Sequence, residues 1–175
     1  MCACGTTPPR SAIARACAAI QDATGAVPVG WHTRSTPSVN TRRLLLEHGG
    51  FLYDSDAYSD DLPFFVPVED GRRHLVVPYS FDTNDMHFHH GAQRFTTAAH
   101  FAEYVIDAFD QLWTEGADTP RLLSVGLHLR IIGRPGRIGG LERVLRHLRD
   151  RGSVWLARRD QIARHWLERF PAPHA

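Results

Sequence analysis

Short apolar runs alternate with segments of helical periodicity along most of the chain, and this alternation is the strongest constraint on its fold. Chains that alternate strands with helices generally build β-α-β units around a parallel sheet. We therefore predict an α/β fold with about four parallel strands and helices outside them. The expected strands are residues 27–31, 51–53, 74–79, 121–128 and 153–157, and the expected helices are residues 11–24, 40–49, 97–116, 141–151 and 160–170.

Polar side chains follow directly after several of the expected strands. They are Arg34, then Asp54 and Asp56, then Asp82, Asn84 and Asp85, and finally His128 and Arg130. The carboxyl ends of parallel strands meet at one edge of a sheet, and ligands bind at that edge in such folds. We therefore expect these side chains to share one ligand site.

His128 is the sharpest candidate for a catalytic group, because it ends the apolar run of residues 122–127. An imidazole at the mouth of a barrel can act as a general acid or base near neutral pH. The alternative is a core histidine whose ring nitrogens are hydrogen-bonded within the protein. Arg130, Arg134 and Arg137 favour a functional histidine, since guanidinium groups in the expected loop 129–140 suit carboxylate or carbonyl oxygens.

Two acidic segments leave their roles open. Carboxylates in residues 54–61 could orient a base, bind a ureido or amide N–H group, hold a metal or form local turn hydrogen bonds. The pattern favours neither interpretation for Asp56, and it favours turn formation for Asp60 and Asp61. In residues 82–85, Asn84 offers both a donor and an acceptor, which suits an amide-like ligand.

His87, His89 and His90 form a candidate metal site, because a His-x-His pair on a strand places two ligands on one face. No suitably spaced carboxylate completes the set, so we predict no metal site and no cofactor. Cys2, Cys4 and Cys17 lack a second cysteine pair, and we interpret them as reduced thiols.

The charge of the chain gives no reason to expect a polyanionic partner. Its 175 residues include 20 Lys and Arg against 19 Asp and Glu, which predicts no binding to nucleic acid or to an anionic membrane. No apolar run approaches the roughly 20 residues needed to span a bilayer. Residues 1–10 lack the layout of a signal peptide, so we expect a cytoplasmic protein.

Several motifs follow one another in a fixed order. They are Gly30-Trp31-His32-Thr33-Arg34 with Asn40-Thr41-Arg42-Arg43-Leu44, residues 51–56 with 60–64, Pro78-Tyr79 with residues 82–86, residues 123–128 with 133–137, and residues 154–159 with 162–167. Together they resemble the allantoinase-like branch of the polysaccharide deacetylase (NodB-like) superfamily, a group associated with purine catabolism. The resemblance implies the C-terminal portion of a distorted (β/α)7 barrel, incomplete here, with an irregular segment at residues 1–10 and the catalytic portion at residues 11–175.

The resemblance also implies roles for individual residues. His128 matches the histidine that ends a leucine-rich strand and serves in catalysis, and Arg34 falls in a segment that replaces an arginine motif of the deacetylases. The superfamily's paired aspartates, one of which is the base, and its metal-binding histidine pair have no match in this chain. We therefore expect the chain alone to lack a complete active site.

The implied activity is hydrolysis of a carbon–nitrogen bond in a cyclic ureide such as allantoin. The expected catalytic residues are His128 and Asp56, and the expected substrate-binding residues are Trp31, Arg34, Asp82, Asn84, Asp85, Arg130 and Arg134. The alternatives are a polysaccharide N-deacetylase, or an inactive remnant or subunit that needs an N-terminal partner. The expected partners are a small ureide substrate and either a second copy of the chain or the unmatched N-terminal half.

Overall fold

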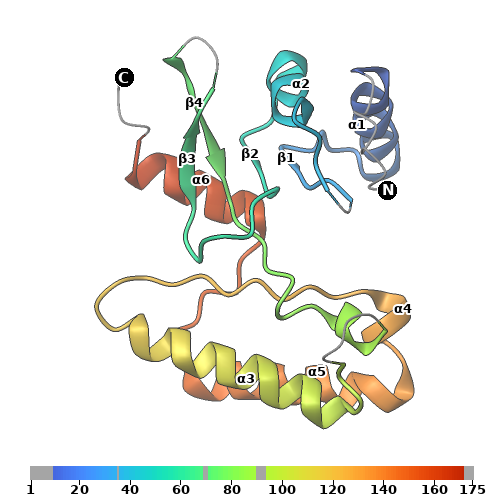
Figure 1. The fold of residues 1–175 in the computed structure, drawn as a ribbon, viewed down its shortest axis with the longest axis vertical. Helices are drawn as coiled ribbons and strands as arrows, with labels where there is room; N and C mark the ends of the chain where they lie inside the picture. The colour runs from blue at the N-terminus through green and yellow to red at the C-terminus, as the bar shows by residue number, and fades with distance from the viewer. Residues whose placement is uncertain (1–9, 35, 69–70, 90–93, 172–175) are drawn as a thin grey trace. The chain divides into compact units, whose positions relative to one another are not determined.

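The computed structural model of the chain describes residues 10–34, 36–68, 71–89 and 94–171. The chain divides into two compact units, of which unit 1 comprises residues 1–78 and 157–175 and unit 2 comprises residues 79–156. Unit 1 holds α1 (Arg10–Thr24), β1 (Gly30–Trp31), α2 (Thr41–His48), β2 (Tyr53–Asp54), β3 (Phe64–Pro67), β4 (Arg73–Val76) and α6 (Arg159–Arg169) (Figure 1). Unit 2 holds the 3-10 helix η2 (Asp85–Phe88), α3 (Ala98–Glu115), α4 (Leu129–Ile132) and α5 (Pro135–Arg151).

The four strands of unit 1 form one sheet in the order β1-β2-β4-β3. β1 pairs with β2 and β2 with β4 in parallel, which confirms the parallel arrangement predicted for the first three strands. β3 pairs with β4 in antiparallel fashion and was not predicted. It lies at the edge of the sheet and ends at Pro67, a residue that an edge strand tolerates because its missing N–H is not needed by a further neighbour.

Two of the strand predictions are wrong in the described part of the chain. Residues 121–128 carry only an isolated parallel bridge between Gly126 and Asn84, and residues 153–157 are assigned to no strand. An apolar run indicates burial, but a strand also requires a neighbouring backbone with which to exchange hydrogen bonds. The sequence pattern carries no information about that neighbour.

Two hydrophobic clusters hold unit 1 together. One lies between α1 and α2, which run side by side (Figure 1), and contains Ile13, Leu44 and Leu45. The other lies between the sheet and α6, and contains Tyr53, Leu75, Val77 and Ala163. The second cluster thus holds β2 and β4 against α6, because Tyr53 lies in β2, Leu75 in β4 and Ala163 in α6.

Unit 2 is built on α3 and α5, whose shared core includes Phe101, Val105, Val144 and Leu148. The helix expected at residues 97–116 is α3, and Thr97 caps it by accepting a hydrogen bond from His100 N. Residues 135–140 were expected to be a loop but form the first turns of α5, and this correction has a packing reason. A Cβ atom at Gly140 would lie 2.5 Å from the carbonyl oxygen of Ala98, so a poor helix former is needed there to let α3 and α5 approach.

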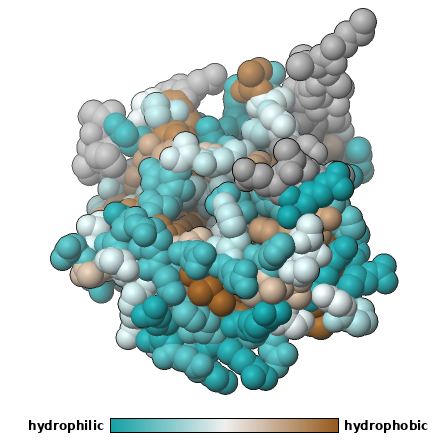
Figure 2. Space-filling model, turned by 60° about the horizontal axis from the view of Figure 1, so that its bottom comes forward, coloured by the Kyte–Doolittle hydropathy of each residue, from teal (hydrophilic) through white to brown (hydrophobic). Residues whose placement is uncertain are grey.

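The surface is mainly hydrophilic on the face that Figure 2 shows, with separate hydrophobic areas. Large apolar side chains that stay exposed include Val39, Leu129 and Leu156. Within the described ranges, no helix combines the length and the apolar character needed to cross a membrane.

Candidate functional site

His128 and Asp85 form a hydrogen-bonded pair in unit 2. Asp85 Oδ1 lies 2.7 Å from His128 Nδ1, and Asp85 Oδ2 accepts hydrogen bonds from the backbone N–H of His128 at 2.7 Å and of Ile132 at 3.2 Å. Asp85 is fully buried, whereas the side chain of His128 is 31% exposed. The carboxylate therefore has its hydrogen bonds satisfied inside the protein, and the imidazole remains accessible.

The pairing assigns roles to the two ring nitrogens of His128. An ionised carboxylate only accepts hydrogen bonds, so Nδ1 carries a proton and donates a hydrogen bond to Asp85 Oδ1. Nε2 is then the nitrogen that can take up or release a proton at the exposed side of the ring. This arrangement suits general acid–base catalysis, because a buried carboxylate that fixes the tautomer also stabilises the protonated imidazole.

The local backbone brings the pair together from two separate segments of the sequence. Asp85 N donates to Gly126 O at 2.9 Å and Gly126 N donates to Thr83 O at 3.2 Å, which forms the parallel bridge. Thr83 Oγ1 also donates to Ser124 O at 2.5 Å. Sequence reasoning named Asp85 and His128 as separate candidates and missed their contact, because the residues are 43 positions apart.

Both ends of the Asn84 side-chain amide form hydrogen bonds within the protein. Its Nδ2 donates to the Tyr79 hydroxyl at 2.5 Å, and its Oδ1 accepts from Met86 N at 2.8 Å. The residue is only 4% exposed. The donor and acceptor that the sequence offered to a ligand are thus used to hold residues 79–86 in place.

Asp56 lies in unit 1, where both of its carboxylate oxygens bind Thr33. Thr33 N donates to Oδ1 at 2.7 Å and Thr33 Oγ1 donates to Oδ2 at 2.5 Å. The indole N–H of Trp31 donates in turn to Thr33 Oγ1 at 3.0 Å, and His32 Nδ1 lies 3.4 Å from Asp56 Oδ1. The side chain of Asp56 is 3% exposed, so it joins the loops that follow β1 and β2.

Asp54 ends β2, and its buried carboxylate lies next to the side chains of Arg42 and His74. Arg42 donates to both carboxylate oxygens, at 2.6 and 3.1 Å, and His74 Nε2 lies 3.3 Å from Oδ2 without the alignment of a hydrogen bond. Burial alone would raise the pKa of Asp54, but the nearby His74 and Arg42 lower it to about 2. Asp54 raises the pKa of Arg42 by hydrogen bonding in turn. Sequence reasoning left Arg42 out of the site, although it lies in one of the quoted motifs.

Arg159 is another residue near the strand ends that sequence reasoning left out of the site. Its Nη1 donates to Ser55 Oγ at 3.1 Å and to the carbonyl oxygens of Val77 at 3.0 Å and Pro78 at 2.9 Å. These oxygens follow β2 and β4, so the guanidinium group joins the first turn of α6 to the carboxyl edge of the sheet. Its signal in the sequence was its place in the motif of residues 154–159.

The remaining predicted binding residues lie at the surface. Arg34, Arg130 and Arg134 are exposed, and Arg134 Nε contacts Arg130 O at 3.4 Å. Asp82 is exposed and accepts a hydrogen bond from the Tyr104 hydroxyl at 2.7 Å, which raises the pKa of Tyr104. Trp31, Arg34 and Asp56 belong to unit 1 and the other predicted site residues to unit 2, so their sharing one site stays a prediction.

The histidines near residue 90 do not fit a metal ion as far as the structure describes them. His87 Nε2 contacts Phe81 O at 3.0 Å and His89 Nε2 contacts Arg137 at 3.1 Å, while His90 lies outside the described residues. Among the described side chains, no group of three or more histidine, cysteine, aspartate or glutamate residues is placed to hold a metal.

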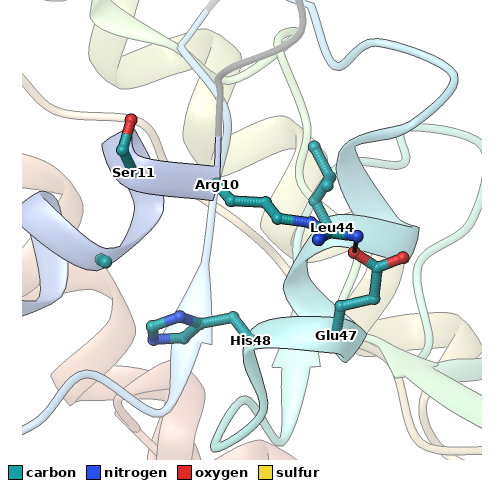
Figure 3. Close-up of a pocket in the computed structure, with 6 residues that line it drawn as sticks. Arg10, Ser11, Leu44, Glu47 and His48 are labelled. Atoms are coloured by element: carbon teal, nitrogen blue, oxygen red, sulfur yellow. Dashed lines mark ion pairs between the residues drawn. The ribbon is translucent and has the colours of Figure 1, made fainter.

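A groove lies between α1 and α2, away from the residues that follow the strands. It is lined by Arg10, Ser11, Ala14, Leu44, Glu47 and His48, with a volume of about 430 Å³ (Figure 3). An ion pair of 2.7 Å between Arg10 and Glu47 spans it. His48 precedes β2, whereas Asp54 ends that strand, so the groove is not part of the strand-end site.

Comparison with known proteins places this geometry among related folds. No protein-family profile matches the chain. It is 37% identical over 169 residues to a Schizosaccharomyces pombe protein named "Putative polysaccharide deacetylase", covering 87% of this chain and 52% of that protein. Among solved structures, it matches Puue allantoinase with 47% identity and a TM-score of 0.88, over 94% of this chain and 54% of the other. It matches a "probable Polysaccharide deacetylase" from Pseudomonas aeruginosa PAO1 with 46% identity and a TM-score of 0.87, again over 94% and 54%. The chain thus spans about half the length of these relatives.

Proposed function

Because the chain belongs to the polysaccharide deacetylase superfamily, we propose that it takes part in hydrolysing a carbon–nitrogen bond in a cyclic ureide, converting allantoin to allantoate. The observation that carries the proposal is the pairing of a buried Asp85 with a partly exposed His128. The similarity to Puue allantoinase, at 47% identity, supports a ureide as the substrate.

The chemistry assigns His128 the role of general acid. Water adds to the ring carbonyl carbon and loses a proton to a base. The carbon–nitrogen bond then breaks, and the leaving nitrogen takes a proton from Nε2 of the doubly protonated His128 ring, which returns to the neutral form with its proton on Nδ1. Asp85 keeps the imidazole oriented for this transfer through Nδ1. The exposed Arg34 and Arg130 are candidates for binding the carbonyl oxygens on which negative charge develops.

The base is the part of the reaction that this chain does not account for. The paired aspartates that serve as base in the superfamily have no counterpart among its motifs. In the described structure, both carboxylate oxygens of Asp56 are occupied by Thr33. We therefore propose that turnover needs a second polypeptide segment that carries the paired aspartates.

The test is allantoate release by purified chain 1–175, alone and mixed with the part of Puue allantoinase that it does not match. The mixture should turn over and the chain alone should not. His128→Ala should lower kcat of the mixture by about 10²–10⁴-fold, the usual contribution of a positioned acid–base residue. The control is His147→Ala, since His147 also contacts an aspartate, Asp110 at 2.8 Å, but on the surface of α5. Turnover by the chain alone, or turnover indifferent to His128→Ala, would contradict the proposal.

The alternative function is N-deacetylation of a sugar polymer, which the names of two of the reported relatives support. The same Asp85–His128 pair would then protonate the amino group that leaves the acetyl carbon. Acetate release from chitin oligosaccharides by the same mixture separates the two functions. We expect allantoate release to exceed acetate release, and the reverse would favour the deacetylase.

A further inference from the structure

We propose that Asn84 is a positioning residue for the Asp85–His128 pair and does not bind substrate. This inference rests on the proposed function only for its kinetic readout. Asn84 is 4% exposed, and each end of its amide already has a partner inside unit 2. A substrate would have to break one of these buried hydrogen bonds to reach it, which is costly.

The two hydrogen bonds of Asn84 fix the backbone that carries Asp85. Oδ1 accepts from Met86 N at 2.8 Å and so caps η2, whose first residue is Asp85. Nδ2 donates to the hydroxyl of Tyr79 at 2.5 Å, which ties this cap to the residues that precede it. Asp85 therefore begins a helical turn whose position is set by the side chain immediately before it.

Gly126 shows how closely the side chains of Asn84 and Tyr79 pack against the opposite segment, residues 124–126. A Cβ atom at Gly126 would lie 2.2 Å from the Tyr79 hydroxyl and 2.4 Å from Asn84 Nδ2. The Asn84 amide thus lies directly against the backbone that leads to His128, and it fixes the register of the bridge between residues 83–85 and 124–126. A slip of one residue would displace Asp85 by about 3.3 Å along the chain, which is more than a hydrogen bond tolerates.

The consequence reaches the chemistry through Asp85. While Asp85 Oδ1 stays 2.7 Å from His128 Nδ1, one tautomer of the ring is selected. If the hydrogen bonds of Asn84 to Tyr79 and Met86 are lost, the carboxylate of Asp85 is less well placed and the neutral ring of His128 populates both tautomers. The carboxylate then stabilises the doubly protonated ring less, and this is the form whose Nε2 gives a proton to the leaving nitrogen, so turnover falls while substrate affinity stays.

The experiment compares Asn84→Ala with Thr97→Ala, which also removes an N-cap hydrogen bond within unit 2 but does not touch the pair. Long-range ¹H–¹⁵N spectra of chain 1–175 report the tautomer of His128 without any substrate. We expect Asn84→Ala to raise the Nε2–H share at least about threefold, and in the allantoate assay to lower kcat about 10–100-fold with KM changed less than about twofold. Thr97→Ala should leave the spectrum unchanged.

Other outcomes decide against the proposal. An unchanged tautomer together with a raised KM would make Asn84 a substrate-binding residue. If Asn84→Ala does not fold, Tyr79→Phe removes only the hydroxyl that Asn84 contacts, and it should shift the tautomer in the same direction. An unchanged spectrum in that variant would overturn the inference. Because the spectra need no turnover, failure of the proposed function leaves this test intact.

Discussion

Replacing Asp85 with asparagine should invert the tautomer of His128 while the protein stays folded. Among the described residues, Oδ2 accepts two backbone N–H groups, those of His128 and Ile132, whereas the hydrogen bond of Oδ1 is with His128 Nδ1. Asparagine has a single acceptor oxygen, and two buried N–H groups outweigh one ring nitrogen. Its oxygen should therefore take the Oδ2 position, and its NH₂ group should face Nδ1, which must then accept.

The magnitude of the effect on stability follows from these three contacts. Hydrogen bonds to a charged acceptor contribute about 1.5–3 kcal/mol each, against about 0.5–1.5 kcal/mol for neutral ones. Neutralising the acceptor of three bonds thus costs about 3 kcal/mol, and no longer burying a charge offsets part of this. We expect a net loss of about 1–3 kcal/mol in the free energy of unfolding, measured in urea.

The effect on chemistry should be much larger. With Nδ1 accepting, Nε2 holds the only ring proton, and the carboxylate that stabilises the imidazolium is gone. We expect kcat to fall about 10²–10⁴-fold. ¹H–¹⁵N spectra should show the His128 proton on Nε2 in Asp85→Asn, and the surface variant Asp110→Asn should leave His128 unchanged. A proton that remains on Nδ1 in Asp85→Asn would refute the reasoning.

The other predictions concern stability. The pKa of Asp54 is about 2 in the folded protein against an ordinary 3.8, so its ionised form contributes stability above pH 3.8 that is lost as the pH falls through 2. This contribution is about 2 kcal/mol, and Asp54→Asn should flatten the acid limb of stability measured by circular dichroism; an equally steep limb would count against it. Gly140→Ala should destabilise by about 1–3 kcal/mol because its methyl group meets Ala98, whereas Gly139→Ala, with open space around it, should stabilise by about 0.5–1 kcal/mol. Equal thermal shifts in the two glycine variants would refute the packing argument.

The sequence predicted local features well where one residue type decides the geometry. Helix α3 begins directly after Thr97, where a helix start was expected, and the polar residues after β2 and before η2 occur where the pattern placed them. The antiparallel edge strand β3 escaped prediction because nothing in residues 64–67 specifies the direction of a partner. The start of α5 escaped because Gly140, one of the glycines that make this segment look like a loop, is required by the close approach of α3.

The site was predicted as a set of residues and not as a set of contacts. Asp85, Asn84 and Asp56 all read as polar groups available to a ligand. In the structure, Asp85 instead forms a hydrogen bond with His128, Asn84 forms hydrogen bonds with Tyr79 and Met86, and Asp56 forms hydrogen bonds with Thr33. Side chains of the same chemical type differ here only in which segment lies opposite them, and a single sequence does not record that.

The interrupted connectivity of unit 1 has a consequence for synthesis on the ribosome. Unit 2 is one continuous stretch, residues 79–156, but unit 1 receives α6 only after that stretch is complete. Arg159 in α6 binds Ser55, 104 residues earlier. Unit 2 can therefore finish folding while Leu75 and Val77 still lack the helix that covers them. The sheet of unit 1 is the part of the nascent chain that stays exposed longest, and it is the surface that a chaperone would meet.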